Sequence, residues 1–232
     1  MNLAIHQPQY LPWLPYLQKI ERCDSFVLLD SVDFQKNGLQ NRNQIKTSQG
    51  AQWLTVPVRQ RLGQKIIEVE IDSSSDWRKK HWQTLLQNYR RAEAFAKFGP
   101  ELEAVYLREW SSLCELSIHL TTLQLRWMGI ERPVFRSSEL GCDGAASMLV
   151  LNICLRMGAT RYLSGTGGKD YLDEAAFRAA GIEIEYLPAR LPRPYAQLFP
   201  KAGFLPDLSA LDILLNCGAK YREYLPVDRE AA

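Results

Sequence analysis

A dense run of polar and aromatic side chains, His6-Gln7-Pro8-Gln9-Tyr10, follows directly after the short apolar segment Leu3–Ile5. Histidine titrates near neutral pH, so His6 can act as a general acid or base in a reacting site. Four neighbouring side chains can orient a bound substrate by hydrogen bonds or stacking: Gln7, Gln9, Tyr10 and Trp13. The alternative for His6 is a structural histidine that is satisfied within a tight turn.

A second polar cluster follows the apolar run Phe26–Leu29. Asp30 and Asp33 close this run, and two neighbouring carboxylates can hold a hydrated magnesium ion or do acid–base work. Basic and amide side chains come next and are suited to binding a carboxylate or a phosphate: Lys36, Asn41, Arg42, Asn43 and Lys46. The alternative is a polar surface loop.

A third cluster is the Gly-rich string Ser164-Gly165-Thr166-Gly167-Gly168-Lys169-Asp170. Glycines allow backbone N–H groups to face an anion, and a following helix adds its positive end. The string lacks the P-loop spacing, and Asp170 stands where G-x-G-x-x-G needs its third glycine. It therefore predicts either an anion cradle built from Ser164, Gly165, Gly168 and Lys169 or an ordinary strand-to-helix turn.

The remaining histidines and the cysteines give weaker signals. His81 lies in a polar and aromatic helical segment, so it is a second acid–base candidate, with a core-edge histidine as the alternative. His119 lies between two apolar residues and is interpreted as structural. The five cysteines are widely spaced, with no C-x-x-C pair and no metal-ligand pattern, and are expected to be reduced thiols of the cytoplasm: Cys23, Cys114, Cys142, Cys154 and Cys217.

Composition narrows the class of protein. The 232-residue chain is 46% hydrophobic and 23% charged, with a net charge of +2. This is typical of a globular enzyme, and the small net charge gives no reason to expect nucleic acid as a partner. No run approaches the roughly 20 apolar residues that cross a bilayer. We therefore expect a cytoplasmic protein that acts on a small molecule, and the oligomeric state stays open.

Strand and helix patterns alternate along the chain. Strands are predicted at Leu3–Ile5, Phe26–Leu29, Trp53–Val58, Ile66–Ile71, Val134–Phe135, Arg161–Leu163 and Ile182–Tyr186. Helices are predicted from Pro12 through Ile20, then at Trp77–Tyr89 after Asp76, Glu101–Met128, Asp143–Gly158, Asp170–Ala180 and Leu208–Leu215. Residues 37–47 are predicted to be a loop.

Alternating strands and helices favour an α/β fold, a Rossmann-like three-layer arrangement with a mostly parallel sheet. We expect a single domain over residues 1–232, with a helical insertion at about 76–128 and an irregular Pro-rich C-terminal tail. In such sheets ligands bind where loops leave the carboxyl ends of the strands. The three polar clusters would then meet at one edge.

Several strings in the chain resemble the WbqC-like family. They are His6-Gln7-Pro8-Gln9-Tyr10-Leu11-Pro12-Trp13, Leu29-Asp30, Asn41-Arg42-Asn43, Trp53-Leu54-Thr55-Val56-Pro57-Val58, Tyr162-Leu163-Ser164-Gly165, Gly168-Lys169, Pro194-Tyr195 and Leu214-Leu215-Asn216. The resemblance covers nearly the whole chain. Arg193 departs from it, because a histidine is expected immediately before Pro194-Tyr195.

The resemblance implies a bacterial cytoplasmic protein encoded among genes for surface polysaccharide, notably the O-antigen of lipopolysaccharide, or for natural products. It implies a transferase that places an aminoacyl or other acyl group on an amino sugar or a similar amine. Tyr195 becomes a candidate substrate contact on the same grounds. Any role that the family gives to a histidine at position 193 is not carried over to Arg193.

Two alternatives remain. The opening strand, polar turn and helix are similar to the first unit of the nucleotidylyltransferase-like fold, which would bring a nucleotide and possible Mg²⁺, but the H-x-G-H turn of that fold is absent. The other alternative is a non-catalytic partner of a biosynthetic enzyme.

Overall fold

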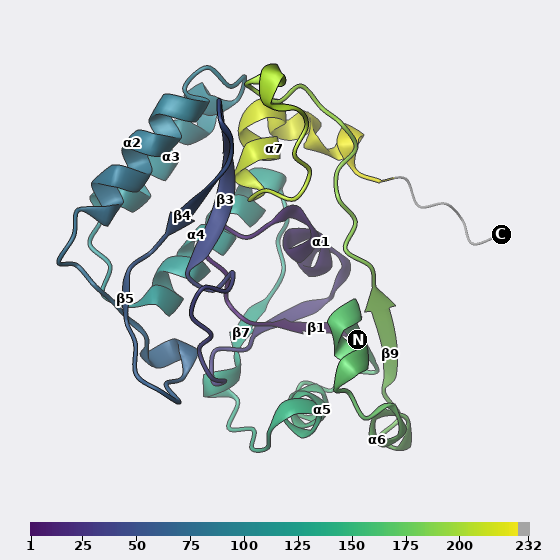
Figure 1. The fold of residues 1–232 in the computed structure, drawn as a ribbon. Coiled ribbons are helices and arrows are strands. Elements are labelled where there is room, and N and C mark those ends of the chain that lie inside the picture. Colours follow the sequence, from purple (N-terminus) through teal and green to yellow (C-terminus); the bar gives the residue numbers. More distant parts are fainter. Residues whose placement is uncertain (227–232) are drawn as a thin grey trace.

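A five-stranded parallel sheet forms the centre of the computed structural model, which describes residues 1–226 (Figure 1). Its strands are β1 (Asn2–His6), β2 (Ser25–Leu28), β7 (Val134–Arg136), β8 (Arg161–Gly165) and β9 (Glu183–Leu187). Their order is β7-β2-β1-β8-β9, and each neighbouring pair is parallel. The predicted α/β fold with a parallel sheet is confirmed.

The direction in which strands are added reverses between β1 and β8. From β1 the chain builds outward through β2 and β7, and it then crosses to the other side for β8 and β9. Such a reversal is a topological switch point, and open α/β sheets bind ligands in the crevice outside the strand ends there. His6 is the last residue of β1 and Gly165 the last of β8, so both lie at this point.

Helices cover both faces of the sheet (Figure 1). One face packs against α1 (Leu14–Arg22), α4 (Leu113–Met128) and α7 (Leu211–Cys217), and the other against α5 (Ala146–Arg156) and α6 (Glu174–Ala179). Alternation along β1 divides its side chains between two hydrophobic clusters: Ala4 belongs to the α1 face, and Leu3 and Ile5 to the α5 face.

Two antiparallel hairpins lie outside the main sheet. One pairs β3 (Arg42–Thr47) with β4 (Gly50–Thr55), and the other pairs β5 (Val58–Arg59) with β6 (Glu70–Ile71) after the 3-10 turn Ile66–Glu68. The predicted loop at 37–47 is therefore wrong in its second half. The predicted strand Trp53–Val58 is divided, because Pro57 separates β4 from β5.

Three helices fill residues 77–128. They are α2 (Trp77–Tyr89), as predicted, α3 (Phe95–Leu107) and α4. The single helix predicted over Glu101–Met128 is wrong, because the backbone turns extended at Arg108 and a new helix starts after Ser112. The Ser112 side chain accepts a hydrogen bond from the Glu115 N–H at 3.3 Å, a helix-capping contact. Gly129 ends α4 in the left-handed conformation, as expected.

The last third of the chain holds shorter helices than the sequence suggests. A 3-10 helix at Thr166–Asp170 follows β8, so α6 starts at Glu174 rather than Asp170. The helix predicted from Asp143 begins at Ala146, and α1 begins at Leu14 with Pro15 in its first turn. Further 3-10 turns are Ser137–Glu139, Pro200–Ala202 and Gly218–Tyr224.

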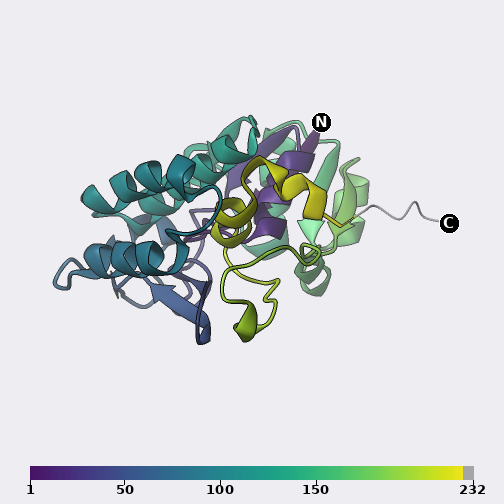
Figure 2. The same cartoon turned by 90° about the horizontal axis from the view of Figure 1, so that it is seen from above.

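Figure 2 shows α2 and α3 at one end of the molecule and the β9 region at the other.

The structure also shows the state of the cysteines and whether any helix could cross a membrane. All five cysteines are free, and four of them are buried. Every helix within residues 1–226 is too short or too polar to traverse a lipid bilayer.

Candidate active site

Two cavities open at the switch point, one on each face of the sheet. The helix-side cavity, of about 430 Å³, lies between α1, the Gly165–Gly167 turn and the segment 187–190. The turn-side cavity, of about 340 Å³, lies between Val150 of α5, the Ser164–Gly168 turn and Tyr171. Four residues line both cavities: His6, Lys19, Gly165 and Gly167. The first and third polar clusters of the sequence thus meet, as the parallel sheet requires.

Lys19 is a buried amine at this meeting point. It lies on the buried face of α1 beside Ile20, and only 6% of its surface is exposed. Its Nζ donates a hydrogen bond to the carbonyl oxygen of Ile5 at 3.1 Å. Burial lowers the pKa of Lys19 to about 7 because a charged ammonium loses its hydration. Burial therefore favours the uncharged amine, which can accept a proton near neutral pH.

His6 is uncharged and only weakly basic. Its Nδ1–H donates to the carbonyl oxygen of Gln7 at 3.1 Å, so Nε2 is the unprotonated nitrogen. The ring packs edge-on against Tyr16 with centroids 5.0 Å apart. Burial, aided by the nearby Lys19 charge, lowers the pKa of His6 to about 3. His6 therefore suits the role of a hydrogen-bond acceptor, and Lys19 is the better proton acceptor near pH 7.

The Gly-rich turn approaches its own strand very closely. Ser164 is buried and its Oγ donates to the carbonyl oxygen of Gly165 at 3.0 Å. A Cβ added to Gly168 would lie 2.1 Å from this Oγ, so any larger residue at 168 would force Ser164 to move. Lys169 extends away, with Nζ 5.2 Å from the ring centroid of Tyr186, and it does not line either cavity. The turn supplies backbone to the cavities, while its lysine packs elsewhere.

This close approach gives a direct prediction. Gly168→Ala is expected to lower the free energy of unfolding by about 1–3 kcal/mol, the usual cost of overpacking, measured by urea denaturation. Gly167→Ala is the matched control, because a Cβ there meets nothing within 4 Å. Adding Ser164→Ala to Gly168→Ala is expected to recover part of the loss. Equal stability of the two single variants would contradict the steric explanation.

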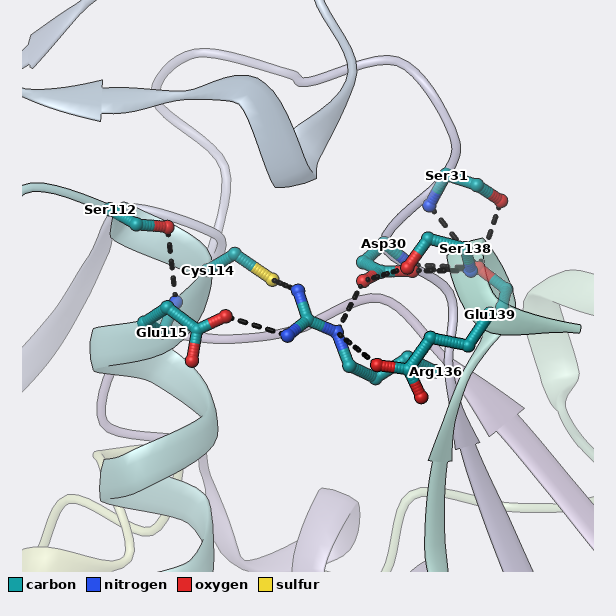
Figure 3. Close-up of polar contacts among 9 residues, drawn as sticks. Asp30, Ser31, Ser112, Cys114, Glu115, Arg136, Ser138 and Glu139 are labelled. Atoms are coloured by element: carbon teal, nitrogen blue, oxygen red, sulfur yellow. Dashed lines mark hydrogen bonds and ion pairs between the residues drawn. The ribbon is translucent and has the colours of Figure 1, made fainter.

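Asp30 is held by donors from the last residue of β7 and from the segment that follows it (Figure 3). Its carboxylate is fully buried and accepts from Arg136 Nε at 2.9 Å, Ser137 Oγ at 3.0 Å and Ser138, whose N–H and Oγ lie at 2.9 and 2.8 Å. Arg136 also pairs with Glu115 at 2.6 Å. With both oxygens engaged and no contact with either cavity, Asp30 ties β2 to the segment after β7.

The other members of the second cluster separate. Asp33 pairs with Lys65 at 2.7 Å on the surface, and Lys36 is exposed on the loop after β2. The guanidinium of Arg42 lies 4.3 Å from the ring centroid of Trp53. Within residues 1–226, no group of three or more His, Cys, Asp and Glu side chains is placed to hold a metal ion. The paired carboxylates are thus not brought together as a magnesium site.

The remaining loop candidates are buried as structural contacts. The side-chain amides of Asn41 and Asn43 donate to the carbonyl oxygens of Val56 and Leu11, at 3.1 and 2.6 Å. Lys46 Nζ donates to Gln197 Oε1 at 2.9 Å, which joins it to the network described next.

This network is centred on Asp212 of α7. Asp212 accepts from the hydroxyls of Tyr89 and Tyr195, each at 2.7 Å, and from Gln197 Nε2 at 2.8 Å. It therefore links α2, the hairpin strand β3 and the tail to α7. Tyr195 is consequently engaged in the network, and Arg193 anchors the tail through its N–H to the Tyr224 carbonyl oxygen at 2.7 Å.

Tyr10 and His81 form part of an aromatic core cluster. The Tyr10 hydroxyl hydrogen-bonds to His81 Nδ1 at 2.8 Å and to the Tyr106 hydroxyl at 2.7 Å. Burial lowers the pKa of His81 to about 4. His81 lines neither switch-point cavity, so its proton chemistry is separated from His6 and Lys19.

The remaining residues of the first motif have mixed surroundings. Trp13 lines the helix-side cavity and Gln7 the turn-side cavity, where Gln7 Oε1 accepts from Gln40 Nε2 at 2.8 Å. Gln9 is buried. The sequence reasoning missed Lys19 and the two tyrosines of the turn-side cavity, Tyr162 and Tyr171. A lysine inside the apolar stripe of the first helix was the available signal for Lys19.

Comparisons with known proteins add one strong likeness. A family model described as the WbqC-like protein family matches residues 7–224. The uncharacterized protein Rv1507c of Mycobacterium tuberculosis is 36% identical over 232 residues, which cover 99% of each chain. No solved structure gives a significant match. The likeness therefore extends over the sheet, both cavities and the tail.

Proposed function

The chain belongs to the WbqC-like protein family, and on that premise we propose that it is a transferase that places an acyl or aminoacyl group on the amine of an amino sugar or a similar compound. The observation that carries the proposal is Lys19, a buried amine at the meeting point of two cavities, with its pKa lowered to about 7. The family resemblance suggests a place in the biosynthesis of bacterial surface polysaccharide, such as O-antigen, or of natural products.

Acyl transfer to an amine requires a proton acceptor near neutral pH. The acceptor nitrogen attacks the acyl carbon, a C–N bond forms, and the bond from the acyl carbon to its leaving group breaks. The proton lost by the nitrogen goes to the uncharged amine of Lys19, while His6 Nε2 accepts a hydrogen bond from the incoming amine. Backbone N–H groups of the Gly-rich turn can stabilise the oxyanion that develops on the acyl oxygen.

A transfer assay with simple probes tests this chemistry. The purified protein is incubated with p-nitrophenyl acetate as acyl donor and glucosamine as acceptor, and N-acetylglucosamine is measured by mass spectrometry. Product formation above the uncatalysed rate is expected. A rate equal to the uncatalysed one, with protein that is folded by circular dichroism, would contradict the proposal and favour a non-catalytic role.

The pH dependence of this transfer is a further prediction. With methoxyamine, an acceptor that is already deprotonated across the range, the rate is expected to rise about tenfold per pH unit below about pH 7 and to level off above it. The sign follows from Lys19, because its ammonium form, which dominates below its pKa of about 7, has no lone pair to accept a proton. A rate independent of pH between 5.5 and 8.5, roughly the range in which such a base titrates, would exclude Lys19 as the base.

A further inference from the structure

The two cavities are separated by the sheet edge itself. Successive side chains of a strand point to opposite faces, so Ile5 lines the turn-side cavity from β1, and Tyr162 and Ser164 line it from β8. On the other face, α1 supplies one wall of the helix-side cavity, and the Gly-rich turn and the segment 187–190 supply others. His6 and Gly165 are the last residues of β1 and β8, and they border both spaces. The cavities therefore meet over the strand ends, the Gly-rich turn and Lys19 of α1.

The chemistry of the two linings differs. The turn-side cavity carries neutral hydrogen-bonding groups and two phenol rings, from Gln7, Ser164, Tyr162 and Tyr171, and Lys19 is the one charged residue in its lining. Neutral donors and acceptors next to aromatic faces are suited to a polyhydroxylated ring, whose hydroxyls and C–H faces alternate. Its volume of about 340 Å³ is at the lower end for small-molecule sites, which suits a single sugar ring.

The helix-side cavity has a different character. Its walls include apolar and proline side chains: Trp13, Pro15, Leu187, Pro188, Ala189 and Leu225. Charged side chains also line it: Lys19, Glu21, Arg22 and Arg190. Two of them are engaged in ion pairs, since Arg22 contacts Glu185 at 2.9 Å and Glu21 contacts Arg222 at 2.5 Å. A cavity of about 430 Å³ with an apolar wall and charged groups beside it is suited to an acyl group with its carrier.

We propose that the cavities are two separate substrate subsites: the turn-side cavity takes the sugar ring of the acceptor, the helix-side cavity takes the acyl donor, and the new bond forms where they meet beside Lys19. This inference rests on the proposed transferase function and adds the face of the sheet from which each substrate enters. The acceptor nitrogen enters from the α5 face, the acyl carbon enters from the α1 face, and the sheet edge keeps the two substrates apart until they meet.

One variant on each face tests the assignment. Tyr171 lines only the turn-side cavity and is half exposed, and Ala189 lines only the helix-side cavity and is exposed. Glucosamine binding is measured by saturation-transfer NMR titration. Tyr171→Ala is expected to weaken it about tenfold, the effect of losing one aromatic and one hydrogen-bonding contact. Ala189→Trp, which fills the other cavity, is expected to change the affinity for glucosamine by no more than about twofold, since distant sites act independently.

Transfer from p-nitrophenyl acetate is measured on the same variants. Ala189→Trp is expected to slow it about tenfold or more by obstructing the donor, while Tyr171→Phe, which keeps the ring, is expected to bind glucosamine better than Tyr171→Ala. Thermal unfolding checks that each variant is folded.

The outcomes separate the two proposals. Glucosamine binding that Ala189→Trp weakens and Tyr171→Ala does not would overturn the subsite assignment, and so would an absence of glucosamine binding. Transfer activity with glucosamine binding insensitive to Tyr171→Ala would support the transferase and overturn the subsites. Glucosamine binding with the expected pattern, but no transfer, would support the sugar subsite and overturn the transferase.

Discussion

Replacing Lys19 by methionine is expected to slow acyl transfer at least about a hundredfold, the usual contribution of a positioned acid–base group, and to raise the free energy of unfolding at the same time. Methionine keeps an unbranched chain of similar length in the same buried space. The stability gain follows from the pKa of Lys19, which burial lowers from 10.5 to about 7. A group that must lose its charge to be buried makes the folded state less stable at neutral pH.

The size and the pH window of this gain can be estimated. A pKa lowered by 3.5 units corresponds to about 4–5 kcal/mol, and losing the hydrogen bond to the Ile5 carbonyl removes about 1 kcal/mol. The difference between these two contributions gives an expected net gain of about 3–4 kcal/mol at pH 7. Between pH 7 and 10.5 the unfolded chain binds one more proton at Lys19 than the folded chain does. Stability of the unmodified protein therefore rises with pH in that window, and the variant lacks this rise.

Urea denaturation of both proteins between neutral and alkaline pH measures the effect. The stability difference between Lys19→Met and the unmodified protein is expected to shrink steadily as pH rises. Lys36→Met is the control, because Lys36 is exposed on a loop and its replacement is expected to change stability by no more than about 0.5 kcal/mol. A Lys19→Met variant that is less stable at pH 7, with a difference that does not vary with pH, would show that the amine is not held in a desolvated state.

The parallel sheet could be predicted because strand and helix patterns alternate along the chain, and such alternation has few folded solutions. The hairpin strand β3 could not be recognised as easily. Its buried positions include Asn43 and Lys46, polar residues that a pattern of hydrophobicity assigns to solvent. Their partners are the Leu11 carbonyl and Gln197, the latter 151 residues away. Local sequence carries no sign of such distant partners.

In the candidate site, too, some features could be predicted from the sequence and others could not. His6 and the Gly-rich turn meet because both follow parallel strands that lie side by side, and this could be inferred from the pattern alone. Asp30 also follows a parallel strand, but its partner Arg136 lies 106 residues away, and that pairing turns a candidate acid–base group into a buried anchor. Lys19 gives only a weak signal in the sequence, its place in the apolar stripe of the first helix, because a lysine in an amphipathic helix is usually solvated. The packing of α1 shows that this lysine is buried.

The pairing of Asp30 with Arg136 predicts a large loss of stability in Asp30→Asn. Breaking a buried ion pair from one side leaves the other charge without compensation, which typically costs about 3–5 kcal/mol. Arg136 keeps Glu115 as a partner on its exposed side, so the lower part of that range, about 3 kcal/mol, is expected. The asparagine amide also presents N–H donors where Ser138 now donates its own N–H and Oγ (Figure 3).

Asp33→Asn is the matched control, because the same substitution there removes only an exposed pair with Lys65, worth about 0–1 kcal/mol. Urea denaturation of the two variants compares the stability lost with the buried Asp30 carboxylate and the stability lost with the surface carboxylate of Asp33. Adding Arg136→Met to Asp30→Asn is expected to cost less than the two single losses combined, because the partners act as a unit. The transfer assay completes the comparison. If Asp30→Asn is as stable as Asp33→Asn but transfers acyl groups far more slowly, Asp30 takes part in the reaction, and its contacts with the segment after β7 do not define its role.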